Sequence, residues 1–97
     1  MLPTHRAPTI PGEILLEEFL KPLNISQTAL AQAMNVPIQR VNTLINGKRS
    51  VTAETAVLLA ETLGTSPEFW MNLQSQSDLY EARRRYDERG RSAERLA

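Results

Sequence analysis

The chain of 97 residues contains no cysteine and a single histidine, and both scarcities exclude chemistry. Without cysteine there are no disulfide bonds and no thiolate metal ligands. His5 lies in a proline-rich segment with no second ligand nearby, so we expect no metal site and no cofactor. Ser26 and Ser50 have no neighbouring base that would activate them as nucleophiles. An enzyme is therefore the least favoured class.

Long apolar runs are also absent. No stretch approaches the roughly 20 residues that a membrane-spanning helix needs, and the N-terminus has no signal-peptide pattern. We expect a soluble, cytoplasmic protein. Hydrophobic residues make up 41% of the chain, which is compatible with several helices that share one core in a single small domain.

A formal net charge of zero argues at first against nucleic acid as a partner. The distribution of charge answers that objection. Residues 26–51 contain Arg40, Lys48 and Arg49 and no acidic residue, whereas glutamates lie on both sides of this segment. Positive charge is thus confined to one segment, and its location matters more than the total. Three positive charges are few, so tight binding would need two copies.

Apolar residues at helical spacing, together with capping residues, predict an all-α fold with five helices at residues 11–86. Pro22 should end the first helix, and Asn35 should form a left-handed turn between the second and third. We expect a mobile arm at residues 1–10 and a disordered tail at residues 87–97. The expected helices run from about Gly12 to Lys21, Ser26 to Met34, Pro37 to Ile45, Ala53 to Leu63 and Ser66 to Asp87.

The segment Ser26–Arg49 contains two short helices, a tight turn and a basic loop, which is the pattern of a helix-turn-helix. The second helix of this motif lies in the major groove of DNA. Its exposed side chains are amides, a hydroxyl and a guanidinium, the groups that read base edges. We expect Ile38, Gln39 and Thr43 to lie closest to the bases, with Ile38 against a thymine methyl.

A second set of residues is suited to the phosphate backbone. Gln27 lies at the N-terminus of the first motif helix, where free N–H groups favour an anion. Asn46, Lys48 and Arg49 follow the second helix as a clamp. Arg40 has two candidate partners, a guanine or a phosphate, and we favour the phosphate.

Dimerisation has a physical argument of its own, because one reading helix makes few base contacts. A two-fold dimer places two such helices one turn of DNA, ~34 Å, apart. The last helix carries four of the five aromatic residues and is the candidate interface, although its aromatics could instead complete the core. The expected interface residues are Trp70, Leu73, Leu79 and Tyr80. The arginines at 83–85 are either a solvated helix end paired with nearby acids or a second contact surface.

Residues 11–80 resemble the HigA family of antitoxins, a branch of the Xre/Cro-type helix-turn-helix proteins. Three segments occur in order and carry the resemblance: PGEILLEEFL, SQTALAQAMNVPIQRVNTLINGKRSVTAETAVLLAETLGTSPEFW and MNLQSQSDLYEAR. The resemblance implies a five-helix, lambda-repressor-like fold and a dimer that binds a palindromic operator ahead of its own toxin–antitoxin operon. It further implies that the protein neutralises a HigB toxin, a RelE-like endoribonuclease that cuts mRNA on the ribosome.

The family's base-reading positions fall on Pro37, Ile38, Gln39 and Thr43, and its phosphate positions fall on Gln27, Asn46 and Lys48. The chain departs from the family pattern at two places: Asn35 replaces the usual turn glycine, and Ile38 stands where arginine is frequent.

Two alternatives share the fold. A stand-alone Xre-type repressor would bind DNA without a toxin partner, and a pure protein-interaction module would inhibit a toxin without binding DNA.

Overall fold

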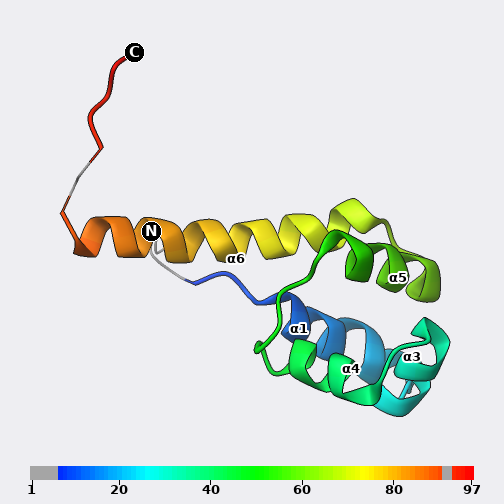
Figure 1. The fold of residues 1–97 in the computed structure, drawn as a ribbon. Helices are drawn as coiled ribbons and strands as arrows, with labels where there is room; N and C mark the ends of the chain where they lie inside the picture. Colours follow the sequence, from blue (N-terminus) through cyan, green and yellow to red (C-terminus); the bar gives the residue numbers. More distant parts are fainter. Residues whose placement is uncertain (1–6, 91–92) are drawn as a thin grey trace.

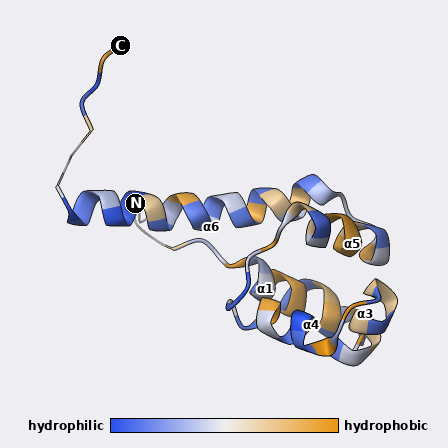
Figure 2. Ribbon diagram, in the orientation of Figure 1, coloured by the Kyte–Doolittle hydropathy of each residue, from blue (hydrophilic) through white to orange (hydrophobic). Residues whose placement is uncertain are grey.

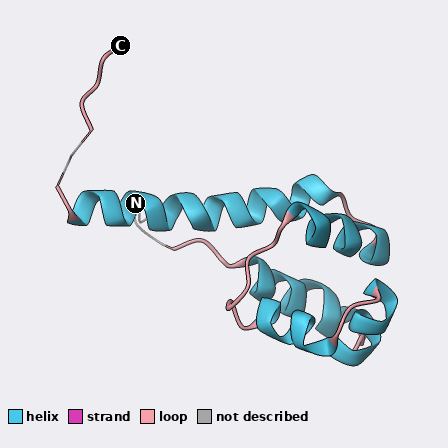
Figure 3. Cartoon of the chain, in the orientation of Figure 1, coloured by secondary structure: helices cyan, strands magenta, loops and turns pink. Residues whose placement is uncertain are grey.

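The computed structural model describes residues 7–90 and 93–97, and the regular structure in these residues is entirely helical (Figures 1 and 3). The predicted all-α fold of five helices is confirmed. Residues 1–6, which include His5 and most of the expected arm, and residues 91–92 of the expected tail lie outside the described part. The first helix has three consecutive segments, and the full order is α1 (Pro11–Ile14), η1 (Leu15–Leu20), α2 (Lys21–Leu23), α3 (Gln27–Met34), α4 (Ile38–Ile45), α5 (Ala53–Leu63) and α6 (Pro67–Glu88).

Pro22 does not end the first helix, contrary to the prediction. The helix continues to Leu23, and Asn24 ends it in the left-handed conformation with φ 56°. The segment η1 before the proline is π-helical, and the N–H of Lys21 bonds to the carbonyl of Leu16, five residues earlier. In a regular α-helix the proline ring would collide with the carbonyl four residues before it. The wider π turn explains how this helix accommodates Pro22.

The core is centred on Trp70, whose side chain is fully buried within the chain. Its ring packs against Phe19 and Phe69 with centroid distances of 5.3 and 5.0 Å. Its indole N–H donates a hydrogen bond of 2.7 Å to the hydroxyl of Thr65. Trp70 therefore joins α6 to the first helix, and the expectation that it lies in a dimer interface is wrong, because its whole surface is used inside its own chain. The other buried apolar residues are Leu15, Leu20, Leu30, Ala31, Met34, Val41, Leu44, Ile45, Val51, Ala56, Leu59 and Ala60.

Local capping explains where the later helices begin. The hydroxyls of Ser26, Thr52 and Ser66 each accept a hydrogen bond from the backbone N–H three residues later. The inward face of α5 includes one polar residue, and one apolar residue of this helix lies outside it. Val57 is 47% exposed, whereas Thr55 is buried with its hydroxyl bonded to that of Thr52.

The longest helix, α6, packs its first turns against α5, and its outer half extends past the other helices (Figure 1). This outer half is mainly hydrophilic, whereas apolar residues are concentrated in the helices of the compact part (Figure 2). The helix-turn-helix segments α3 and α4 therefore lie in the compact part of the protein, well away from the end of α6.

The backbone of α1 approaches the end of α4 very closely at Gly12. A Cβ atom at this position would overlap the carbonyl oxygen of Leu44 and lie 2.7 Å from that of Ile45. Only glycine leaves room for this approach. Because the atoms that would collide belong to the backbone, a side-chain rotation cannot relieve the overlap.

We expect Gly12→Ala to lower the free energy of unfolding by about 3 kcal/mol, because the helices must separate to admit the methyl group. Thermal unfolding followed by circular dichroism should show Tm falling by more than about 10 °C. Gly64→Ala is the contrasting variant, since Gly64 has φ 72° and open space around it. It should cost only the left-handed strain of about 1 kcal/mol. Equal losses in the two variants would contradict the steric explanation.

Candidate nucleic-acid interface

The turn between α3 and α4 has the geometry that a helix-turn-helix requires. Asn35 adopts the left-handed conformation, with φ 58° and ψ 48°, as predicted. The N–H of Val36 bonds to the carbonyl of Ala31 at 3.0 Å and completes the end of α3. Asparagine tolerates this conformation better than most residues, so the turn forms without the glycine that the family usually has.

The helix α4 has one buried and one exposed face. Val41, Leu44 and Ile45 point into the core. Gln39 is exposed on the opposite face, and Ile38 at its edge is 40% exposed. The structure thus places two of the predicted base-reading residues on the accessible side of the helix.

The other two predicted base-reading residues are placed differently. Pro37 is the N-cap of α4, with ψ 148°, so it precedes the helix and is not its first residue. Thr43 is half-buried, and its hydroxyl donates a hydrogen bond of 2.8 Å to the carbonyl of Gln39. The hydroxyl proton is therefore engaged in a hydrogen bond within α4. For a contact with DNA, Thr43 still offers its oxygen as an acceptor and its methyl group as an apolar surface.

A chain of amide side chains links the two motif helices. The amide of Asn42 donates to the side-chain oxygen of Gln27 at 3.4 Å, and the amide of Asn46 donates to that of Asn42 at 3.3 Å. Two predicted phosphate residues are thus joined through Asn42, which the sequence analysis did not select. Its spacing of four residues from Asn46 is the signal that could have identified it, because side chains at this spacing meet on a helix.

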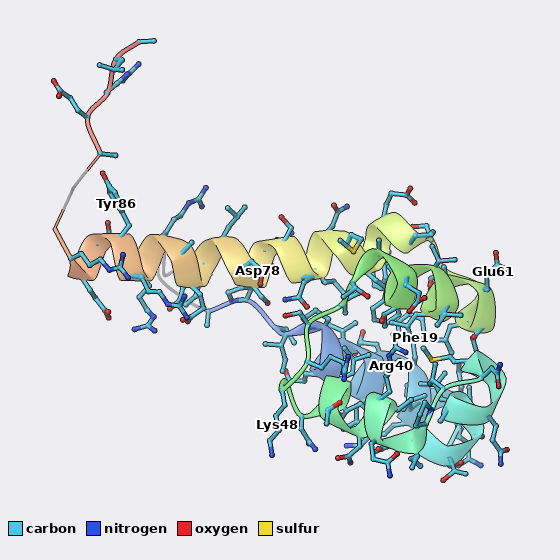
Figure 4. All side chains as sticks on the ribbon, in the orientation of Figure 1. Phe19, Arg40, Lys48, Glu61, Asp78 and Tyr86 are labelled. Atoms are coloured by element: carbon cyan, nitrogen blue, oxygen red, sulfur yellow. The ribbon has the colours of Figure 1, made fainter. Side chains whose placement is uncertain are left out.

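The basic loop follows α4 directly. Gly47 has φ 74°, and the N–H of Lys48 bonds to the carbonyl of Thr43 at 2.9 Å, so the loop turns sharply away from the helix axis. Lys48 and Arg49 are exposed, and Lys48 points away from the body of the protein (Figure 4). A Cβ atom at Gly47 would lie 3.0 Å from the side chain of Ile10, so the turn also rests on the segment before α1.

Arg40 lies apart from the other predicted phosphate residues. It extends from α4 toward the start of α5, and its Nη2 lies 2.9 Å from Oε1 of Glu54. The side chain of Arg40 is 29% exposed and that of Glu54 is 74% exposed. The sequence analysis missed this partner because Glu54 lies three residues beyond the acid-free segment and on another helix.

The remaining candidates for a dimer interface lie along α6. Leu73 is half-buried against the core, Tyr80 is half-buried, and Leu79 is 48% exposed. A groove of about 810 Å³ runs between the segment before α1 and the outer half of α6. Its lining residues are Pro8, Gln76, Leu79, Tyr80, Arg83, Arg84, Asp87 and Glu88.

The arginine run at 83–85 includes a charge network on α6. Arg84 forms ion pairs with Glu81 at 3.0 Å and with Glu88 at 2.7 Å. The hydrogen bond from Arg84 lowers the pKa of the Glu81 carboxyl and raises the pKa of the guanidinium. For Arg84 the structure matches the solvated, paired alternative.

Two further observations concern residues 7–90 and 93–97 only. No helix there is long and apolar enough to cross a membrane. No three histidine, cysteine, aspartate or glutamate side chains there come close enough together to hold a metal ion.

Comparisons with known proteins agree with this geometry. A family model described as helix-turn-helix matches residues 16–70. Antitoxin HigA-1 of Vibrio cholerae serotype O1 is 48% identical over 88 residues, which cover 91% of this chain and 83% of that protein.

Two solved structures resemble the whole fold. One is the Pseudomonas aeruginosa antitoxin HigA with the higBA promoter, with TM-score 0.86, 38% identity and coverage of 93% of this chain and 99% of that one. The other is the antitoxin GraA in complex with its operator, with TM-score 0.86, 41% identity and coverage of 100% and 99%. The chain belongs to the helix-turn-helix family and, within it, to the HigA antitoxins.

Proposed function

We propose that this protein binds the operator of its own operon as a homodimer, represses transcription, and neutralises a RelE-like mRNA-cleaving toxin encoded beside it. The observation that carries the DNA-binding part is the exposed polar face of α4, which is followed by an acid-free basic loop. Relatives solved with promoter or operator DNA support the same role, because they match nearly the whole chain at 38–41% identity.

In the proposed complex, α4 lies in the major groove and presents Ile38, Gln39 and the methyl group of Thr43 to base edges. The amide of Gln39 suits adenine, and the two apolar groups suit thymine methyls. Pro37 approaches the groove at the N-terminal end of the helix. Since α4 exposes few such groups, sequence discrimination depends on two copies of the helix.

Phosphate contacts set the register on the duplex without reading sequence. We propose Gln27, Asn46, Lys48 and Arg49 for this role. Gln27 and Asn46 are connected through Asn42 by hydrogen bonds of 3.4 and 3.3 Å, which favour one arrangement of these side chains before DNA binds. Such preorganisation lowers the entropy lost on binding.

For the homodimer we propose contacts along the outer half of α6, with Leu79 and Tyr80 at the centre and Leu73 at the edge. This helix extends beyond the compact part of the chain, so its outer half can contact a second subunit without displacing α4 (Figure 1). Leu79 is a large apolar residue that is 48% exposed in the single chain. Its burial between two subunits would remove apolar surface from water.

The function as a whole is tested by gel-shift titration of the protein on the DNA upstream of its gene, with and without the product of the adjacent gene. We expect a specific shift that the adjacent product changes. A shift that ignores the product would instead support a stand-alone repressor. No shift at low salt would contradict DNA binding and leave a protein-interaction module.

If Gln39 reads a base, Gln39→Ala should weaken binding to the operator by about 1–3 kcal/mol and leave binding to random DNA nearly unchanged. Fluorescence anisotropy with both duplexes measures the two losses. Equal losses on the operator and on random DNA would show that Gln39 positions the protein and does not read sequence.

If Lys48 contacts a phosphate, Lys48→Ala should reduce the slope of log affinity against log salt by about 0.9 per chain, because one fewer counterion is released. The matched control is Arg89→Ala, which removes a positive charge from the far end of α6 and should leave the slope unchanged. An unchanged slope in Lys48→Ala would remove Lys48 from the contact set.

A further inference from the structure

We propose that Glu54 limits the sequence-independent part of this protein's affinity for DNA, because its carboxylate compensates the positive charge of Arg40. The inference rests on the proposed DNA-binding function and adds to it a residue outside the helix-turn-helix. It concerns the flank of the DNA-binding surface that faces the start of α5.

The geometry places an acidic group beside the one arginine of α4. Nη2 of Arg40 lies 2.9 Å from Oε1 of Glu54, and the two residues come from different helices. Glu54 lies in the first turn of α5, where the helix dipole favours a negative charge. The carboxylate is therefore anchored on a rigid element, two residues after Thr52, which caps that helix.

The position of Arg40 on α4 explains why this pairing affects DNA binding. The buried face of the helix is formed by Val41, Leu44 and Ile45, and Gln39 lies on the opposite, exposed face. Arg40 lies between these faces, with its side chain 29% exposed. In the proposed complex, a guanidinium at this edge of α4 faces the backbone of the bound duplex once it is released from Glu54.

The electrostatic argument does not require the ion pair to be strong. Exposed ion pairs contribute little to stability, so a phosphate could compete for the guanidinium. That phosphate would then lie near the carboxylate of Glu54, which is 74% exposed and repels it. Whichever partner Arg40 takes, the flank adds no net positive charge to the surface.

A flank without net charge has a consequence for the affinity of this protein for DNA of any sequence. Counterion release gives sequence-independent affinity, and an added cation strengthens binding to every duplex equally. Compensation of Arg40 therefore lowers binding to the operator and to random DNA by the same factor and leaves the ratio of the two affinities unchanged. By compensating the charge of Arg40, Glu54 leaves Lys48 and Arg49 as the uncompensated cations of the segment from residue 26 to 51, while the polar face of α4 supplies discrimination between sequences.

The test compares Glu54→Gln, Arg40→Ala and the double variant on random and upstream duplexes over a range of salt concentrations. Glu54→Gln should steepen the salt dependence by about 0.9 per chain and tighten random binding roughly fivefold at 0.15 M salt. Arg40→Ala should weaken binding, because an unpaired carboxylate remains. The double variant, which removes both charges, should return to the wild-type slope.

Two controls separate the pair from general charge and from shape. Glu61→Gln makes the same change of charge seven residues further along α5, at its far end from Arg40 (Figure 4), and should leave the slope unchanged. Glu54→Asp keeps the charge on a shorter side chain and should retain the wild-type slope. Circular dichroism of each variant checks that α5 is intact.

The inference is overturned if Glu54→Gln leaves random binding unchanged, or if the double variant loses a full unit of slope relative to wild type. The second result would mean that Arg40 contacts a phosphate in spite of Glu54. Binding that responds to Lys48→Ala but not to Glu54→Gln would overturn this inference alone. Failure of the wild-type protein to bind any duplex would overturn the proposed function itself.

Discussion

The fold depends on the contact between the start of α1 and the last carbonyls of α4, where Gly12 allows two backbones to approach without a side chain between them. This contact fixes the C-terminal end of α4, and the basic loop begins one residue later. Ile10, just before α1, also rests against Gly47 at the turn of that loop. The first helix thus sets the position of the reading helix and of the loop together, although it contributes no residue to the proposed DNA contact.

The far end of the loop is held by α6. The N–H of Val51 donates a hydrogen bond of 2.8 Å to the side-chain oxygen of Gln74, and Val51 itself is buried. Gln74 is in turn oriented by a hydrogen bond of 2.9 Å to Asp78. Since Trp70 fixes this part of α6 to the core, the loop between Asn46 and Val51 is anchored at both ends. Its exposed cations are therefore carried on a short and constrained segment.

The sequence predicted the features that depend on neighbouring residues. The caps at Ser26, Thr52 and Ser66 form locally, and Asn35 takes the left-handed turn because few other residues do so at low cost. The inner face of α4 is formed by Val41, Leu44 and Ile45, which follow the apolar spacing typical of a helix. The side chains left on the other face then followed from geometry alone.

The errors concern contacts between residues that are distant in the sequence or depend on tertiary packing. Trp70 was assigned to an interface because an aromatic residue on a helix is compatible with either a partner or a core, and only the packing of Phe19 decides between them. The first helix continues past Pro22 because a π turn precedes the proline, and no local propensity predicts this turn. The pairing of Arg40 with Glu54 was missed because Glu54 lies on another helix. Asn42 was missed because its role is to connect Gln27 with Asn46.

Contacts within the chain have a common physical effect on the candidate interface: they limit the interactions that its polar groups are free to make. The hydroxyl of Thr43 donates a hydrogen bond to a carbonyl of its own helix, and Asn42 connects two neighbouring amides. Arg40 forms an ion pair with a carboxylate. Each constraint removes an interaction that would be available to any duplex and leaves groups whose direction is set in advance. A surface of this kind gains little affinity from charge and depends on shape and on amide geometry instead. Strong binding then requires a second reading helix at the correct spacing. The low positive charge of α4 and its loop is therefore a reason for the proposed dimer along α6.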